Sequence, residues 1–342
     1  MQTQLRQAVV VAFGRTPYCK ARKGSFAQLH PVEYGAQTLL GVLARVPQLR
    51  PEDIGDVIMG CAMPFGVQGG NMARLIVQRA GLPDCVTAQT VNRYCSSGLQ
   101  TIATAANAIR CGEEDVVIAG GVESMSLVPM LVGAEDADPW LAEHRPEVYT
   151  TMGITAENVA RQWGISRADM DAMAVESHRR AAQAQAGGCF DGQIIPITVP
   201  GPDGGEVVVC RDEGIRPGTT AETLAGLKPC FLENGSVTAA TSSQMTDGAG
   251  FVVLMSEEKA AELGVKPLAR FVSFATGGVP AEVMGVGPIE AVPKALRKTG
   301  LTLEQMDTIE LNEAFASQAL AVIRTLGMDP ARVNPWGGAM AL

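Results

Sequence analysis

One cysteine, Cys95, lies in a short polar segment of the sequence, NRYCSSG at residues 92–98. An extended run precedes this segment and an alanine-rich run with helical spacing follows it, so we expect a helix to begin at the cysteine. The unpaired N–H groups and the positive end of the dipole at a helix N-terminus favour a thiolate, which would lower the pKa of Cys95 and make it a nucleophile. The small residues Ser96, Ser97 and Gly98 would let a substrate carbonyl approach the backbone closely.

Cysteines elsewhere in the chain are expected to have structural roles, because most cysteines behave as small buried hydrophobes. We assign this role to Cys61, Cys85, Cys111, Cys189, Cys210 and Cys230. The chain has 8 cysteines but no CxxC pair, and it is neither short nor rich in cysteine. A disulfide scaffold or a zinc site is therefore a poor interpretation, so we predict no metal site and free thiols in a reducing compartment.

The elements that would position Cys95 are predicted from short apolar runs. Their continuous apolar character is typical of strands that are covered on both faces of a sheet. The runs span residues 8–13, 56–60, 115–121, 251–256, 269–276 and 308–314. Amphipathic helices lie between them; in the helix after Cys95, one apolar face runs from Leu99 to Ile109, and Gly112 is the predicted C-cap.

Residues 122–246 differ in character from both ends of the chain. They are rich in proline and glycine, and they contain one clear helical tract, 166–186, but few runs of strand length. We interpret them as a covering insertion over a site on an α/β core. The core itself is predicted to be duplicated, because TVNRYCSSGLQTIATAANAI and TIELNEAFASQALAVIRTL both read as strand, polar turn and helix.

Composition excludes several classes of protein. The chain has 342 residues, of which 46% are hydrophobic and 18% charged, with 38 glycines, which fits a compact α/β enzyme of two or three domains. A net charge of −9 argues against a broad nucleic-acid footprint. No apolar stretch has the length needed to cross a membrane, and the N-terminus reads as a first strand rather than a signal peptide.

Several segments together resemble the thiolase family in order and spacing, over nearly the whole chain. They are NRYCSSGLQTI, AGGVESMS, MGITAENVA, SSQMTDGAG, VMGVGPIEA and LNEAFASQ. The resemblance implies a layered αβαβα fold of two related halves with a long covering insertion. The N-terminal half would be 1–121, completed by 247–268; the covering domain, which binds coenzyme A, would be 122–246; and the C-terminal half would be 269–342.

The activity that the resemblance implies is that of an acyl-CoA acyltransferase. It would cleave a 3-ketoacyl-CoA thiolytically or condense acetyl-CoA units, with coenzyme A as a substrate and no permanently bound cofactor. Cys95 would form the acyl thioester, and its backbone N–H would contribute to one oxyanion hole, while Asn312 would hold a water in another. Such chemistry needs a soft nucleophile and donors aimed at the developing oxyanion.

Ligand contacts are also implied by the resemblance. Coenzyme A would be contacted by Arg216, Leu227, Phe231 and Ser243, and the acyl pocket would be lined by Ala314, Phe315, Met152 and Met284. An arginine suits the phosphates of this anionic ligand, and apolar side chains suit its pantetheine arm. Ordinary core packing is the alternative role for the methionines and phenylalanines, and Arg216 would otherwise be a solvated charge. Thr151 stands where some members carry a histidine, which leaves the acyl-chain specificity open.

The last residues, VNPWGGAMAL, correspond to a segment that in thiolases continues into Gly-His-Pro and later into a second cysteine in a glycine-rich turn. That histidine activates the nucleophile, and the second cysteine handles the proton on the reacting carbon. We therefore expect a chain truncated at its C-terminus with an incomplete second half. We expect His30 near a helix start and His144 and His178 in solvent, so that none of them replaces the missing base.

A second function follows from this expectation: a catalytically inactive, thiolase-like protein that binds CoA esters, or a gene remnant. In either case we expect acyl-CoA or CoA as the ligand, no nucleic acid and no membrane as partners, and a homodimer or homotetramer. Thiolase-like folds pair through strands near the nucleophile, which is the basis of the last expectation. The expected location is a bacterial cytoplasm.

Overall fold

The computed structural model of the protein describes residues 5–130, 136–201 and 203–342. The chain forms two compact units: Met1–Met130, Asp191–Glu213 and Met245–Val272 make the first, and Leu131–Phe190, Gly214–Gln244 and Ser273–Leu342 make the second. The predicted covering segment 122–246 is thus divided between both units. Residues 1–4, 131–135 and 202 of the predicted domains lie outside the described residues.

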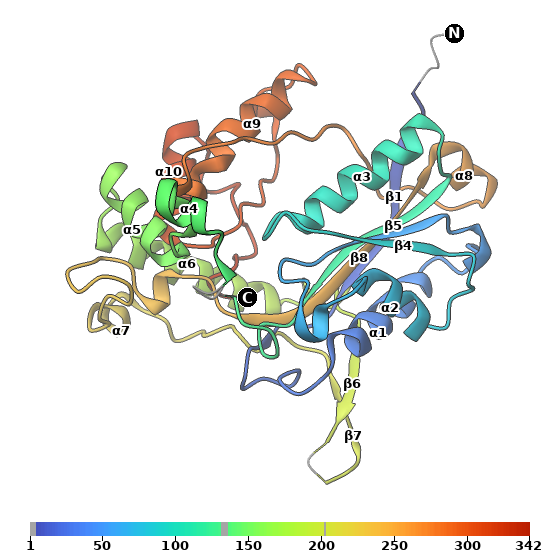
Figure 1. The fold of residues 1–342 in the computed structure, drawn as a ribbon, viewed down its shortest axis with the longest axis horizontal. Helices are drawn as coiled ribbons and strands as arrows, with labels where there is room; N and C mark the ends of the chain where they lie inside the picture. Colours follow the sequence, from blue (N-terminus) through green and yellow to red (C-terminus); the bar gives the residue numbers. More distant parts are fainter. Residues whose placement is uncertain (1–4, 131–135, 202) are drawn as a thin grey trace. The chain divides into compact units, whose positions relative to one another are not determined.

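The first unit is built on a mixed β-sheet with the strand order β4-β3-β5-β8-β1-β9 (Figure 1). The strands are β1 (Ala8–Arg15), β3 (Asp56–Gly60), β4 (Thr87–Val91), β5 (Val116–Glu123), β8 (Thr246–Ser256) and β9 (Ala269–Arg270), and β2 (Cys19–Lys20) pairs with β8. β3 runs parallel to β4 and β5, whereas β8 runs antiparallel to β5 and β1. The strands predicted at 8–13, 56–60, 115–121 and 251–256 are confirmed.

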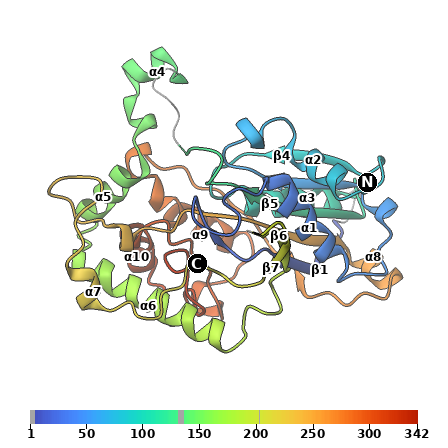
Figure 2. The ribbon, with the colours of Figure 1, turned by 90° about the horizontal axis from the view of Figure 1, so that it is seen from below.

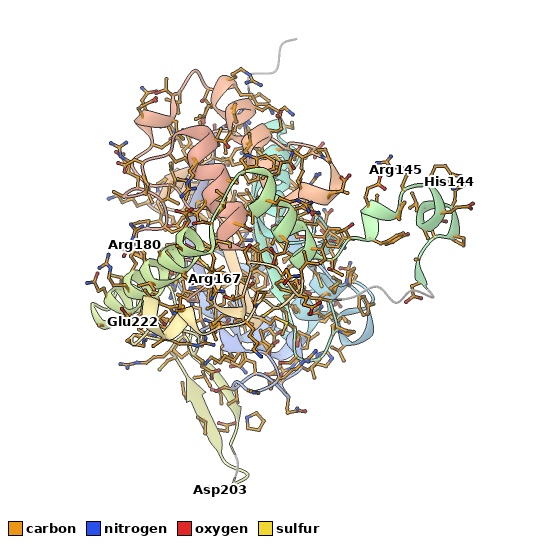
Figure 3. All side chains as sticks on the ribbon, turned by 90° about the vertical axis from the view of Figure 1, so that its left-hand side faces the viewer. His144, Arg145, Arg167, Arg180, Asp203 and Glu222 are labelled. Atoms are coloured by element: carbon orange, nitrogen blue, oxygen red, sulfur yellow. The ribbon has the colours of Figure 1, made fainter. Side chains whose placement is uncertain are left out.

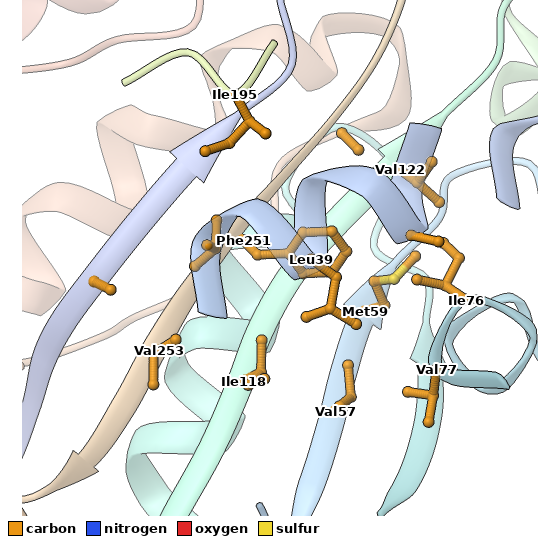
Figure 4. Packing of buried hydrophobic residues seen from close by; sticks show 14 of the residues in the cluster. Leu39, Val57, Met59, Ile76, Val77, Ile118, Val122, Ile195, Phe251 and Val253 are labelled. Atoms are coloured by element: carbon orange, nitrogen blue, oxygen red, sulfur yellow. The ribbon is translucent and has the colours of Figure 1, made fainter. Parts of the chain in front are cut away.

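Helices cover both faces of this sheet, as the continuous apolar runs predicted. The helices α1 (Pro31–Leu43) and α2 (Met72–Arg79) lie on one face, where Leu39 and Ile76 pack with Val57 and Ile118 of the strands (Figures 2 and 4). On the other face lies α3 (Ser97–Cys111), whose Ile109 packs with Ile58 and Val117, the strand residues that alternate with those facing α1 and α2. Alternate strand residues therefore serve two separate cores.

Three smaller elements complete the first unit. The helix α8 (Glu257–Glu262) follows β8, and the strands β6 (Ile197–Pro200) and β7 (Glu206–Val209) form an antiparallel hairpin. His30 is the N-cap of α1 and its Nδ1 accepts a hydrogen bond from the N–H of Val32, so the predicted place of His30 near a helix start is confirmed.

The second unit is largely helical. Its helices are α4 (Pro139–His144), α5 (Met152–Gln162), α6 (Arg167–Ala186), α7 (Ala221–Ala225), α9 (Gly287–Arg297) and α10 (Ala316–Leu326). The helix predicted at 166–186 is confirmed, and it begins at a capping box between Ser166 and Asp169. One core of this unit joins α5, α6 and α10 through Ala156, Ala174 and Ala316.

Two predicted strands differ in the structure. Only Ala269–Arg270 of the run 269–276 is paired as a strand, and the run 308–314 pairs through the single bridge between Ile309 and Val333. A strand needs hydrogen-bonded neighbours along its length, and within the described residues these two runs have neighbours at only a few positions. The layered fold of two halves expected from the resemblance is therefore seen as a regular sheet only in the first unit.

Candidate active site

Cys95 lies in a tight turn between β4 and α3. Asn92 Oδ1 accepts a hydrogen bond from the N–H of Tyr94 at 2.8 Å, and Tyr94 has a positive φ of 46°. The hydroxyl of Ser97 accepts from the N–H of Arg93 at 2.8 Å and donates to the carbonyl of Tyr94 at 2.6 Å. The turn is thus held by side chains on both sides of the cysteine.

The helix begins later than we expected. α3 starts at Ser97 with Ser96 as its N-cap, so Cys95 precedes the cap by one residue. Gly112 ends the helix in the left-handed conformation, with φ 78°, as predicted. The predicted apolar face is correct for Ile109, which is buried, and wrong for Leu99, of which 60% is exposed.

The expected lowering of the Cys95 pKa is wrong for this structure. Cys95 as a whole is an exposed residue, but its thiol is surrounded by neighbouring atoms. The resulting desolvation raises the pKa of the thiol. The residue's own N–H opposes this effect, and the negative charge of Glu123 adds to it. Because Cys95 stands outside the helix, the dipole and the free N–H groups of the first turn do not outweigh burial.

Glu123, at the end of β5, is a residue near the turn that the sequence analysis missed. Its oxygens accept hydrogen bonds from the N–H of Ala62 at 2.7 Å, from the side-chain amide of the buried Gln68 at 2.7 Å and from the N–H of Met63 at 3.3 Å. Asn92 in turn donates to the carbonyl of Ala62 at 3.0 Å. The position of a carboxylate directly after an apolar strand is the signal that could have identified it.

Asn312 lies in the second unit, in the turn before α10. Its neighbours Leu311 and Glu313 are both buried, whereas Asn312 itself is exposed. The predicted nucleophile and the predicted oxyanion-hole residue thus belong to different units of the chain.

Several predicted ligand contacts come together in the second unit. Phe315 is buried in one apolar cluster against which Met152 and Ala314 also pack. The ring of Phe231 lies edge-on to that of Phe315, with centroids 5.9 Å apart and planes at 81°. The N–H of Ser243 donates to the carbonyl of Ala314 at 2.9 Å. These residues therefore lie against one another, with Phe315 buried and Phe231 the exposed member of the group.

Arg216, Leu227 and Met284 lie on other segments of the second unit, and all three are exposed. The backbone N–H of Arg216 donates to Nδ1 of His178 at 3.2 Å. His178 is only 3% exposed, so its predicted place in solvent is wrong. The N–H of Arg216 reaches the ring of His178 on α6 from a distant segment, and the apolar pattern of the helix did not reveal such a contact. His144 is exposed, as predicted, and it stacks on Trp140.

The remaining cysteines are less buried than we expected. Cys61 is buried and its pKa is raised by desolvation to about 12. Cys189 is half-buried, and the others assigned to the core are exposed: Cys85, Cys111, Cys210 and Cys230. The described part of the chain contains no group of three or more His, Cys, Asp or Glu side chains arranged to hold a metal ion. None of its helices combines the length and the apolar character needed to span a bilayer.

Comparisons with known proteins match this chain along nearly all of its length. The family model described as "Thiolase, N-terminal domain" matches residues 8–258, and "Thiolase, C-terminal domain" matches residues 265–342. The "3-ketoacyl-CoA thiolase" of Bacillus subtilis is 51% identical over 346 residues, covering 99% of this chain and 88% of the relative. The human "3-ketoacyl-CoA thiolase, peroxisomal" is 43% identical, covering 100% of this chain and 81% of the relative.

The fold is similar to a solved structure. The acetyl-CoA acetyltransferase of Bacillus anthracis matches with a TM-score of 0.92 and 39% identity, covering 99% of this chain and 88% of the solved one. A second half corresponding to the C-terminal domain model is therefore present in the chain.

Proposed function

The chain belongs to the thiolase family and is an acyltransferase of thiolase type, and we propose that Cys95 is the nucleophile with which it transfers acyl groups to and from coenzyme A. The observation that supports this proposal is the turn itself. The side-chain oxygens of Asn92 and Ser97 accept hydrogen bonds from backbone N–H groups of the turn and so hold it around a cysteine that remains exposed. The proposed substrate is a 3-ketoacyl-CoA, as in the names of the Bacillus and human relatives.

In the proposed reaction the Cys95 sulfur attacks the 3-keto carbonyl, and the tetrahedral intermediate collapses by breaking the bond between carbons 2 and 3. Carbon 2 takes up a proton and leaves as acetyl-CoA, while the acyl group stays on Cys95 as a thioester. The thiol of free CoA then attacks this thioester, the acyl-CoA leaves and Cys95 regains its proton. Because the pKa of Cys95 is raised, its proton must pass to a general base at the moment of attack.

Coenzyme A is proposed to bind along the surface formed by Phe231, Phe315 and Met152. Apolar and aromatic side chains there suit the pantetheine arm, and Arg216 supplies a cation for its phosphates. Ser243 adds a polar position beside Ala314. Asn312 is proposed to hold the water of an oxyanion hole, for which its exposed side chain is suited.

A homodimer or homotetramer is also proposed. β4, which leads into the Cys95 turn, is an edge strand of the described sheet, and its Thr87 and Gln89 are exposed. An exposed edge offers free N–H and C=O groups to a strand of another chain. The proposed bacterial cytoplasmic location is supported by the eight cysteines, all of which are unpaired in the structure.

Acylation of Cys95 is the test of the proposed nucleophile. The chain is incubated with acetyl-CoA or acetoacetyl-CoA, and peptide mass spectrometry reports which cysteine carries an acetyl thioester. We expect acetylation of Cys95 and none of the exposed Cys85 or Cys230, with no acetylation in C95S. If CoA slows the alkylation of Cys95 by iodoacetamide but no acetylation is found, the chain is instead a non-catalytic binder of CoA esters.

A further inference from the structure

A buried carboxylate stands next to Asn312. Glu313 is only 3% exposed, yet its oxygens accept three hydrogen bonds from three segments of the second unit. The hydroxyl of Ser177 on α6 donates at 2.7 Å, the side-chain amide of Asn334 at 3.0 Å and the N–H of Met340 at 3.2 Å. A buried carboxylate is tolerated when donors of this kind replace its water.

Asn334 fixes the residue on the other side of Asn312. Its Oδ1 accepts from the N–H of Leu311 at 2.8 Å, and its Nδ2 donates to the carbonyl of Leu311 at 2.8 Å and to Glu313. Asn334 adopts a left-handed conformation with φ 47°, which asparagine tolerates better than most residues. Arg180 of α6 holds this segment by donating to the carbonyl of Val333 at 2.6 Å (Figure 3).

Two glycines let the chain pass close to Glu313 and α6. A Cβ on Gly338 would lie 2.3 Å from Cδ of Glu313, and a Cβ on Gly337 would lie 2.6 Å from the carbonyl oxygen of Ser177. Gly337 also has a φ of 83°. The segment 337–340 can therefore lie this close to Glu313 and α6 only because neither glycine has a side chain. In this position the N–H of Met340 donates to the carboxylate of Glu313.

We propose that Glu313 is a positioning residue that acts through Asn312. With Asn334 it clamps both neighbours of Asn312, so that the exposed Asn312 amide is presented in one fixed direction. The inference rests on the proposed function, in which Asn312 holds the oxyanion-hole water. The proposal assigns a role to the buried carboxylate of Glu313. The three donors around Glu313 need a side chain that only accepts hydrogen bonds.

A neutral amide cannot replace this carboxylate. All three partners of Glu313 donate, Asn334 to Oε1 and both Ser177 and Met340 to Oε2. The NH₂ group of a glutamine would therefore face at least one donor, which would lose its acceptor. The turn that carries Asn312 would then shift, while the coenzyme A surface at Phe231 and Phe315 would be retained.

The test compares E313Q, N312A and the double variant N312A/E313Q in thiolysis of acetoacetyl-CoA. We expect E313Q to lower kcat by about 10- to 100-fold, because small misplacement of a catalytic group has effects of this size. The KM for CoA should change by no more than about twofold, since the residues proposed to bind it are untouched. In the N312A background E313Q should have no further effect on kcat. E304Q is the control, because Glu304 is an exposed glutamate of the same unit whose pKa is not affected by Glu313.

A second readout does not depend on turnover. Hydrogen exchange at the amides of Leu311 and Met340 should be faster in E313Q than in the wild type and unchanged in E304Q. S177A, which removes one donor and leaves the charge, should give a smaller loss of kcat that also disappears in the N312A background. S177A replaces E313Q as the test of the proposal if E313Q does not fold.

The inference is overturned if exchange at these amides is unchanged in E313Q, or if E313Q lowers kcat equally in the presence and absence of Asn312. It is also overturned if N312A has the kcat of the wild type while C95S is inactive, in which case the proposed nucleophile stands. If C95S retains the wild-type kcat, the proposed nucleophile fails, and the exchange experiment still decides whether Glu313 holds the turn.

Discussion

Gly153 lies directly against the ring of Phe231. A Cβ atom at position 153 would be 2.1 Å from Cδ1 of that ring, far inside van der Waals contact. The same ring also packs edge-to-face with the ring of Phe315. The absence of a side chain at Gly153 therefore determines where Phe231 stands on the surface proposed to bind coenzyme A.

Substitution G153A should displace the Phe231 ring. We expect the Kd for CoA, measured by calorimetry, to rise about fivefold and the free energy of unfolding to fall by about 1–3 kcal/mol, as in other overpacked sites. In an F231A background G153A should have little further effect on the Kd. G226A is the control, because a Cβ at Gly226 would meet no atom within 4 Å. An unchanged Kd in G153A would contradict this role of the glycine.

Alkylation should report the raised pKa of Cys95. Because desolvation and the charge of Glu123 both favour the thiol, iodoacetamide should modify Cys95 at pH 7.5 more slowly than the exposed Cys85 of the same chain. The rate at Cys95 should still be rising with pH at pH 9. Mass spectrometry of the two cysteine peptides over time gives both rates.

Removal of the negative charge of Glu123 should partly reverse the rise in the pKa of Cys95 and so speed its alkylation. E123Q lowers the pKa of Cys95, so its alkylation at pH 7.5 should be faster by a factor on the order of three, as expected for a partly screened charge. Cys85 should react at its original rate. A slower reaction of Cys95 in E123Q would mean that the turn, which Glu123 supports through residues 62 and 63, has collapsed over the thiol.

Asp212 and Arg15 form a buried ion pair in the first unit. Two hydrogen bonds of 2.7 and 2.9 Å join them, and the carboxylate has 0% exposed surface. D212N should lower the free energy of unfolding by about 3 kcal/mol, because it removes a fully buried negative charge that faces a mostly buried guanidinium. Urea unfolding followed by circular dichroism measures this change. The exposed pair of Glu290 and Lys294 is the control, and E290Q should cost less than about 0.5 kcal/mol.

Acid should weaken the second unit through Glu176 on α6. Arg179 and Arg180 lower the pKa of this carboxyl to about 2 from an ordinary 4.5. The stabilisation is therefore present above pH 4.5 and is lost as the pH falls from 4.5 towards 2. Because the side chain is 39% exposed, we expect solvent screening to limit the effect to about 1 kcal/mol.

Thermal unfolding between pH 7 and pH 2 checks this prediction. The midpoint of E176Q should lie below that of the wild type at pH 7 and should approach it at pH 2. D203N is the control, since Asp203 is exposed at the tip of the β6–β7 hairpin (Figure 3). Parallel curves for E176Q and the wild type across this range would show that the arginine pair contributes nothing to stability.

The sheet of the first unit could be predicted from sequence because its strands are covered on both faces, which gives apolar runs without polar alternation. The same pattern at 269–276 and 308–314 was misleading, since an apolar run shows only that a segment is to be buried. Whether it pairs as a strand depends on the neighbours that tertiary structure supplies. The helix start near Cys95 was misplaced because Tyr94, with its positive φ, extends the turn.

The roles of polar residues were harder to predict than the fold. Glu123, Glu313 and His178 each bond to segments more than 20 residues away in sequence, and no local pattern reveals such partners. Aromatic and apolar positions such as Phe231 and Phe315 were identified through the resemblance, and the structure brings them into contact. The pKa of Cys95 depends on packing around the sulfur, which sequence does not report.

The position of β8 has a consequence for how the protein is made. This strand lies between β5 and β1, yet it leaves the ribosome long after both, with α5 and α6 of the second unit synthesised in between. At a synthesis rate of roughly 5–20 residues per second, the edges of β5 and β1 that pair with β8 therefore stay open for on the order of 10 seconds or longer. Such open edges can pair wrongly with other strands, and a chaperone that shields them would act before residue 256 emerges.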